Sequence, residues 1–275
     1  MKRGIISAVF SVLAVFAGAA SAQGFDHSHA AWSVLLKKHV SWQGRDSANG
    51  VTTVADYAGF KRDRAALQTY TATLAAVKQA DYDRWTRLQK QAYLINAYNA
   101  YTVELIVGKY PNLKSIKDLG SVISSPWSKA LYPLLGKKRS LDNIEHDLLR
   151  GAPDFNEPRI HFAVNCASIG CPALRPEAFV ADNLSAQLED QTRRFLKDRS
   201  RNRLDRKSGE LRVSQIFDWY RADFEKGFIG AKDLQNFLGR YAGSLGLTVA
   251  EKKALINGDI DIGFTEYDWS INDRK

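Results

Sequence analysis

The sequence predicts a mostly helical α+β protein, a single domain with a small β-sheet and a central buried helix at about residues 83–108. Eight segments have helical periodicity, whereas only four short segments have the pattern of strands. The chain has 275 residues, 45% hydrophobic and 25% charged, which excludes disordered and fibrous proteins. No linker rich in proline, glycine or serine and no internal repeat divides residues 23–275, so we expect one globular domain there.

Residues 1–22 have the pattern of a cleaved signal peptide. Lys2 and Arg3 are followed by an apolar run from Ile5 to Ala17 and by the small-residue cleavage pattern Ala20-Ser21-Ala22. The run is too short to span a membrane, and no later stretch approaches the necessary length, so we expect no transmembrane anchor. We expect the mature chain, from Gln23, to be periplasmic or secreted.

Helical periodicity accounts for most of the remaining chain. The last predicted helix opens with a capping box, in which Thr248 is followed by Glu251. The predicted helices cover residues 28–39, 56–78, 83–108, 141–150, 176–199, 215–226, 231–245 and 249–257.

Strand signals are fewer and shorter. Residues 203–206 and 210–214 flank Lys207-Ser208-Gly209, a pattern that predicts a hairpin. The apolar residues of 159–165 and 260–264 predict two further strands.

The central predicted helix carries two buried amides. Asn99 lies in the middle of an apolar stripe and Asn96 at its edge, while a second apolar face runs along the other side. A buried amide without partners costs about 1–3 kcal/mol, so both must have hydrogen-bond partners. They either hold neighbouring backbone or brace a polar pocket, and in the second interpretation they are candidate binding residues.

The segment 159–172 contains the residues of a candidate catalytic site. In a strand, His161 and Asn165 share one face, and Cys166 stands where the strand signal ends. The small residues that follow, including Ser168, permit a turn in which backbone amides approach the thiol. Such amides would stabilise a thiolate and could form an oxyanion hole.

Several segments resemble the domain of unknown function 547 family. RIHFAVNCASIGCPALRPEAF at 159–179 is similar to its signature, and LINAYNAYTVELI, SLDNIEHDLLR, VSQIFDWYRADF and YDWSIND follow the family's order over about residues 80–273. The resemblance implies no activity, because the family's function is unassigned. It implies family motif positions for His161, Asn165, Cys166, Ser168, Cys171, Asn96, Asn99 and His146.

Cys166 and Cys171, the two cysteines of the chain, admit three interpretations. In an oxidising compartment they form a disulfide, which by closing so short a loop stabilises the fold by only about 2 kcal/mol. Alternatively, Cys166 is a nucleophile whose base is His161 or His146, with Asn165 as the orienting residue and Ser168 beside it. His161 is five residues before Cys166, about 16 Å away in an extended strand, so contact requires a bend.

In the third interpretation His146, His161, Cys166 and Cys171 bind zinc, although their spacing is unlike that of common zinc sites. We therefore expect no metal. The sequence also contains none of the motifs of nucleotide, nicotinamide or metalloprotease sites, so we expect no cofactor.

The positive charge is concentrated in one segment. The net charge is +9, and Arg193–Arg212 contains nine basic and three acidic residues. Arg199, Arg201 and Arg203 are candidate contacts to an anionic envelope component such as lipid headgroups or cell-wall polymer. We expect no nucleic-acid partner, because export removes it and the segment lacks interleaved aromatic residues. The sequence does not predict the oligomeric state.

These observations predict a thiol-dependent hydrolase or acyltransferase acting on amide or ester bonds of envelope material through a thioester at Cys166. The alternative is a non-enzymatic periplasmic binding module with a structural Cys166–Cys171 disulfide, or a His/Cys zinc site, and a basic surface for an anionic partner.

Overall fold

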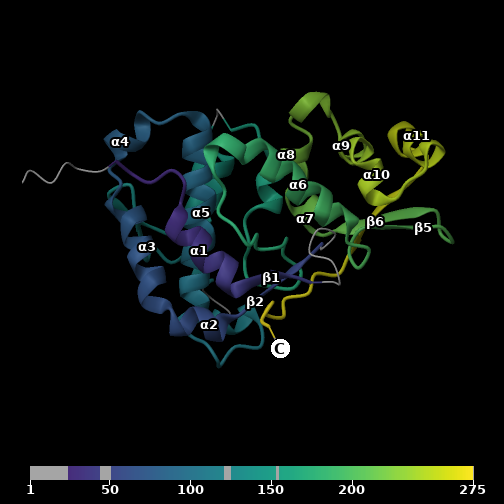
Figure 1. Ribbon diagram of the computed structural model, residues 1–275. Helices are drawn as coiled ribbons and strands as arrows, with labels where there is room; N and C mark the ends of the chain where they lie inside the picture. The colour runs from purple at the N-terminus through teal and green to yellow at the C-terminus, as the bar shows by residue number, and fades with distance from the viewer. Residues whose placement is uncertain (1–23, 44–50, 121–124, 153–154, 275) are drawn as a thin grey trace, which may run out of the picture.

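Helix α5, Arg87–Val107, runs through the centre of the first half of the molecule (Figure 1). The computed structural model describes residues 24–43, 51–120, 125–152 and 155–274, so the predicted signal peptide lies outside the described residues. The residue before α5, Thr86, caps the helix, and its side chain forms a capping box with Gln89. Its residues from Gln91 to Val103 are all buried, which confirms the predicted central helix.

Short elements surround α5 in the first half of the chain. The strands pair as antiparallel hairpins, β1 with β2 and β3 with β4. The elements are α1 (Ala30–His39), β1 (Val40–Trp42), β2 (Thr53–Ala55), α2 (Tyr57–Arg62), α3 (Arg64–Ala76), α4 (Gln79–Asp83), η1 (Ile116–Leu119), η2 (Pro126–Ser128), β3 (Tyr132–Leu134), β4 (Lys137–Arg139) and the π-helical η3 (Asn143–Arg150).

The second half is also mostly helical and contains a three-stranded sheet. The elements are η4 (Pro158–Phe162), η5 (Ala181–Asn183), α6 (Leu184–Lys197), β5 (Arg203–Asp205), β6 (Glu210–Ser214), α7 (Ile216–Trp219), α8 (Arg221–Phe224), η6 (Phe228–Gly230), α9 (Leu234–Arg240), α10 (Ala242–Leu245), α11 (Val249–Asn257) and β7 (Ile262–Thr265). β5 and β6 form the predicted hairpin, and β7 joins β6 in parallel. The α+β fold class is therefore confirmed, as is the capping box at Thr248.

The predicted strand over 159–165 is wrong. η4 occupies Pro158–Phe162, with proline in its first turn and the Glu157 side chain accepting a hydrogen bond from Arg159 N. Ile160, His161 and Phe162 are all buried, so this apolar run is a helical turn enclosed on every side. Periodicity alone does not separate a short buried helical turn from a buried strand.

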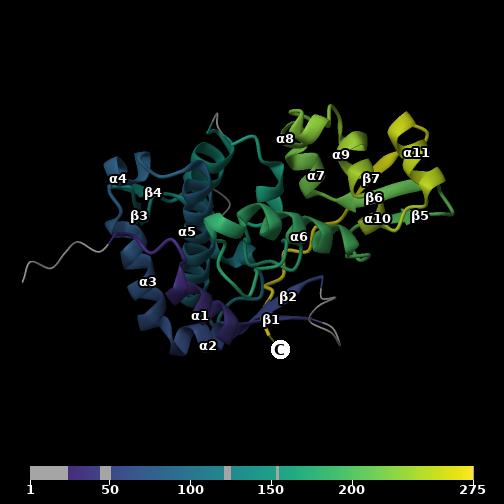
Figure 2. The same ribbon diagram turned by 45° about the horizontal axis from the view of Figure 1, so that its top comes forward.

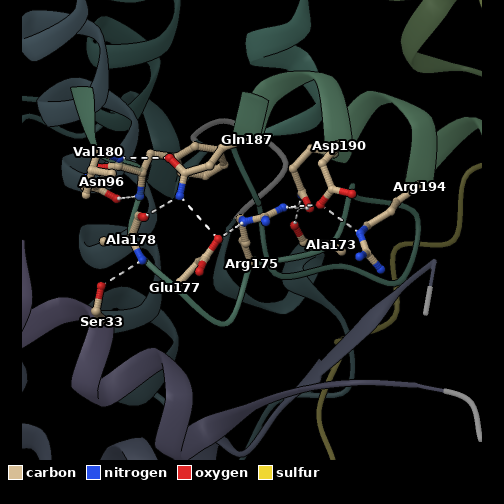
Figure 3. Close-up of polar contacts among 12 residues, drawn as sticks. Ser33, Asn96, Ala173, Arg175, Glu177, Ala178, Val180, Gln187, Asp190 and Arg194 are labelled. Carbon is tan, nitrogen blue, oxygen red and sulfur yellow. Dashed lines mark hydrogen bonds and ion pairs between the residues drawn. The ribbon is translucent and has the colours of Figure 1, made fainter. Parts of the chain in front are cut away.

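The predicted helix over 176–199 begins eight residues late, at Leu184. Residues 176–180 are not helical because side chains of α5 and α6 bind their backbone groups (Figure 3), and residues 181–183 form the short η5. Gln187 donates to Ala178 O and accepts from Val180 N, while Asn96 accepts from Phe179 N. Three other predicted helices, 56–78, 215–226 and 231–245, are each divided into two shorter ones.

Two hydrophobic clusters form the core, and η4 connects them. Ile160 and Ala163 belong to the cluster around α5, whereas Phe162 belongs to the cluster around α6 and the three-stranded sheet. The C-terminal tail, residues 266–274, then runs back from the sheet to β1 and β2 (Figure 2). It forms single bridges from Ser270 to Ser115 before η1, from Ile271 to Ser168 between the two cysteines, and from Asp273 to Ala55 at the end of β2. Among the described residues, no helix is long and apolar enough to span a membrane.

Candidate functional site

A pocket of about 620 Å³ lies beside η3, η4, α7 and the C-terminal tail. This volume is typical of a small-molecule site. Among the described residues, its wall contains six aromatic side chains, two carboxylates, two histidines and both cysteines. The lining residues are Tyr98, Ile116, Lys117, Gly120, Ser125, Pro126, Trp127, Asp142, Glu145, His146, His161, Val164, Cys166, Cys171, Pro172, Ile216, Trp219, Tyr220, Tyr267 and Trp269.

Cys166 and Cys171 form a disulfide in the wall of this pocket. The Cys166 sulfur lies 3.4 Å from Ser168 Oγ and 3.3 Å from Tyr267 Oη. Cys171 Sγ accepts from Cys166 N at 2.9 Å and from the Tyr267 hydroxyl at 3.1 Å. Burial raises the pKa of Tyr267 to about 12, so its hydroxyl keeps its proton at neutral pH.

Hydrogen bonds hold the turn between the two cysteines. Asn165, buried, accepts from Ala167 N through Oδ1 and donates to Pro172 O through Nδ2. Arg201 donates to the carbonyl oxygens of Gly170 and Cys171. These bonds fix both ends of the turn independently of the sulfur bond.

His161 is paired with a carboxylate from α8. Its Nε2 lies 2.8 Å from Asp223 Oδ2, and its ring stacks on Tyr220 at 4.1 Å between centroids. Burial of the imidazole lowers the pKa of His161, although the hydrogen bond to Asp223 acts to raise that pKa. Burial alone would raise the pKa of Asp223, but hydrogen bonds from His161, Arg150 and Lys226 hold that pKa well below its ordinary range. The ionised carboxylate only accepts, so Nε2 of His161 carries the proton and Nδ1 keeps its lone pair.

His146 has the opposite arrangement. Its Nδ1 lies 2.8 Å from Arg150 Nη1, and a guanidinium only donates, so Nδ1 is the acceptor and neutral His146 carries its proton on Nε2. The pocket therefore contains one imidazole that accepts, His161, and one that donates, His146. Neither histidine forms a hydrogen bond with a cysteine sulfur in the described part of the chain.

Two carboxylates that the sequence did not predict as site residues line the pocket. Glu145, buried, accepts from the Tyr220 hydroxyl at 3.0 Å. Asp142 precedes η3, and burial together with the charge of Glu145 raises its pKa. No hydrogen bond to the Asp142 carboxylate is made by any residue that the structure describes.

An aromatic cluster forms another side of the pocket. Trp219, Tyr267 and Trp269 pack against one another with ring centroids 4.5–5.7 Å apart. Trp219 is 46% exposed, and the ammonium group of Lys117 lies 4.8 Å from the centre of the Trp269 ring. Exposed aromatic surface of this kind suits contact with a ligand.

Asn96 and Asn99 do not line this pocket; each binds backbone inside the protein. Asn96 pairs with both backbone groups of Phe179. Asn99 donates to Ala163 O and accepts from Asn165 N. Asn99 thus positions the start of the cysteine turn from the central helix.

The candidate binding arginines also bind backbone. Arg199 donates to the carbonyls of Leu196, Asn202 and Ser244. Arg201 is bonded to Asp198 and to the cysteine turn, and exposed Arg203 donates to the carbonyls of Arg199 and Ser200. The guanidinium groups of these three arginines therefore donate hydrogen bonds within the protein itself.

The four residues of the zinc interpretation have other partners. Both cysteines are in the disulfide, and the histidines bind Arg150 and Asp223. Within the described ranges, no group of three or more His, Cys, Asp or Glu residues could hold a metal ion.

Four members of the site were not predicted from the sequence: Asp223, Glu145, Asp142 and Tyr267. All four lie in segments that carry the family resemblance, and that resemblance was the available signal. No spacing rule could have found them, because they come from three separate regions of the chain that only the fold brings together.

Comparison with protein-family models supports the resemblance over part of its predicted extent. Residues 82–196 match the family described as "Protein of unknown function, DUF547". This range contains α5, η3, η4 and the cysteine turn, but not α7, α8 or the C-terminal tail. No curated protein and no solved structure matches the chain.

Proposed function

Because residues 82–196 form a DUF547 family domain of unknown function, we propose that this protein is a thiol-dependent acyl-transfer enzyme, a hydrolase or acyltransferase. The observation that carries the proposal is the pocket that Cys166 shares with both histidines. We also propose that it acts outside the cytoplasm on amide or ester bonds of envelope material, which rests on the signal-peptide pattern of residues 1–22.

The active form is the reduced one. Reduction by a dithiol frees the Cys166 sulfur from Cys171, and rotation about the Cα–Cβ bond then moves it within the pocket that it shares with His161. Nδ1 of His161 takes the thiol proton, because Asp223 keeps the other nitrogen protonated.

The thiolate forms a bond to the acyl carbon, and the bond from that carbon to nitrogen or oxygen breaks. The leaving group takes its proton from His161. His146 Nε2–H donates to the carbonyl oxygen as it gains negative charge, since Arg150 holds Nδ1. Water, or a second nucleophile deprotonated by His161, then attacks the thioester and regenerates the Cys166 thiol.

An activated ester tests this proposal. The protein is reduced with dithiothreitol, desalted without oxygen and mixed with p-nitrophenyl acetate. We expect a burst of about one nitrophenolate per chain from the wild type and from Cys171→Ser, and none from Cys166→Ser or the oxidised protein. His161→Gln should slow the burst about 10²-fold. A reduced wild type without a burst, or a burst that survives Cys166→Ser, would contradict the proposal.

A second candidate, the non-enzymatic binding module, is favoured by the disulfide and the aromatic wall of the pocket. Its anionic partner would meet basic side chains that are partly engaged already, since Arg206 pairs with Glu251 and Arg212 with Glu210. Binding to vesicles of anionic phospholipid that weakens steeply with salt and with Arg203→Glu would support this candidate.

A further inference from the structure

We propose that the Cys166–Cys171 disulfide is redox-active and that the protein exchanges it with small thiols that enter the pocket, with Cys166 as the attacked sulfur and Cys171 as the leaving sulfur. This activity goes beyond acyl transfer and does not depend on it, since exchange requires neither histidine.

The different exposure of the two cysteine residues gives the exchange its direction. Cys166 is partly exposed in the pocket wall, whereas Cys171 is only 5% exposed. A thiol in the pocket therefore has access to Cys166 first. Reaction rates in exchange depend on which sulfur can be reached and on how well the other leaves.

The leaving sulfur has the shorter hydrogen bonds and the only backbone donor of the two, since Cys166 Sγ has just the longer hydroxyl contacts, 3.4 Å from Ser168 and 3.3 Å from Tyr267, among the described residues. Cys171 Sγ accepts from the Cys166 backbone N–H and from the Tyr267 hydroxyl, and Ser168 Oγ donates in turn to Tyr267 Oη at 3.1 Å. These donors stabilise negative charge as Cys171 becomes a thiolate, which speeds its departure.

The turn that carries the sulfurs does not need the disulfide. Asn165 and Arg201 hold both of its ends. The C-terminal tail also accepts from its backbone, Ile169 N donating to Ser270 O and Gly170 N to Asp268 O, both at 2.8 Å. After reduction the two thiols therefore stay adjacent, and the bond can form again. A purely structural disulfide would duplicate restraints that are already present.

The reaction balances as an ordinary thiol–disulfide exchange. A thiolate bonds to Cys166 Sγ, the Cys166–Cys171 bond breaks, and Cys171 leaves as a thiolate. A second thiolate, from the same dithiol or another thiol molecule, attacks the mixed disulfide and releases Cys166. Two protein thiols and one small disulfide result, the protein being reduced and the small thiol oxidised.

The first experiment measures the reduction rate of the folded protein. Oxidised wild type is mixed with dithiothreitol, quenched with iodoacetamide at set times and weighed intact. We expect reduction within minutes in the folded state, and about tenfold slower reduction of Tyr267→Phe and of Ser168→Ala. Tyr132→Phe is the matched control, because no partner of its hydroxyl is found among the described residues and it lies outside the pocket.

The second experiment tests which sulfur is attacked and which thiolate is stabilised. With glutathione as the probe, rapid quenching and peptide mapping should find the mixed disulfide on Cys166. In Cys166→Ser, alkylation of Cys171 against pH should give a pKa below the ordinary 8.5, and adding Tyr267→Phe should raise it.

Three outcomes would overturn the proposal. They are a disulfide reduced only under unfolding conditions, a mixed disulfide found on Cys171, and equal reduction rates for Tyr267→Phe and Tyr132→Phe. Circular dichroism of the variants shows whether a slow rate reflects a damaged fold. Fast exchange without an ester burst would contradict the acyl-transfer proposal and leave this one standing. An ester burst from protein whose mixed disulfide forms on Cys171, or whose reduction rate is the same in Tyr267→Phe and Tyr132→Phe, would contradict this proposal and leave acyl transfer standing.

Discussion

The two histidines of the pocket show how single neighbours decide the chemistry of a side chain. Asp223 accepts from one nitrogen of His161, and Arg150 donates to one nitrogen of His146. The same ring type therefore presents a lone pair in one case and an N–H in the other. The role of His161 cannot be read from its position in the sequence, because Asp223 is 62 residues away, whereas the partner of His146 lies only four residues after it.

At the residue scale, His161 should make stability depend on pH. Burial lowers its pKa in the folded state, so between the ordinary value near 6.5 and that lower pKa the unfolded chain binds more protons. The free energy of unfolding should therefore fall as pH falls through this window. Urea unfolding at pH 7.5, 6.5 and 5 should show wild type and His161→Gln becoming closer in stability. A difference that stays constant over this range would contradict the prediction.

Helix α5 shows what could be predicted from sequence at the scale of an element. Its two apolar faces and the burial of Asn99 follow from the spacing of its residues, although the helix begins at Arg87 and not at the predicted residue 83. The cysteine segment did not follow in this way. Residues 159–165 are apolar enough to predict a strand, and residues 176–180 lie in a predicted helix, yet neither prediction is right. Distant side chains decide both, so local pattern could predict the residues of the site but not their geometry.

The prediction for this element concerns the side-chain amide of Asn99 in α5. Asn99→Ala removes two buried hydrogen bonds and leaves Ala163 O and Asn165 N without their partner, so we expect a loss of about 2–4 kcal/mol in the free energy of unfolding. Guanidinium unfolding followed by circular dichroism measures it. Asn112→Ala, at an exposed position, is the control and should change stability by less than about 0.5 kcal/mol. Equal effects of the two substitutions would contradict this assignment.

For the whole molecule, η4 and the C-terminal tail connect the two parts of the core. Phe162 and Ile160, two residues apart, belong to different clusters. The tail begins beside the three-stranded sheet and ends against β2, where Asn272 Oδ1 accepts from the buried Tyr57 hydroxyl at 2.7 Å. Neither cluster can lose its structure without exposing residues of these two connections, so we expect one cooperative unfolding transition.

A double-mutant cycle on the tail tests this expectation. Asn272→Ala and Tyr57→Phe should each cost about 1–3 kcal/mol, and the double variant should cost clearly less than their sum, because both remove the same hydrogen bond. Tryptophan fluorescence and far-ultraviolet circular dichroism should give the same midpoint in every variant. Additive costs, or separate midpoints, would show that the tail does not couple the two parts.

The contribution of the tail to the pocket also has a consequence for the order in which the protein is made. Tyr267 lies 101 residues after Cys166, so during synthesis both cysteines emerge long before the side chain that donates to Cys171. In that interval Tyr267 does not yet cover the two sulfurs, and small thiols or oxidants can reach them. Any pairing in that interval would take place in an unfinished site, and only the arrival of the tail gives the pair its selective environment.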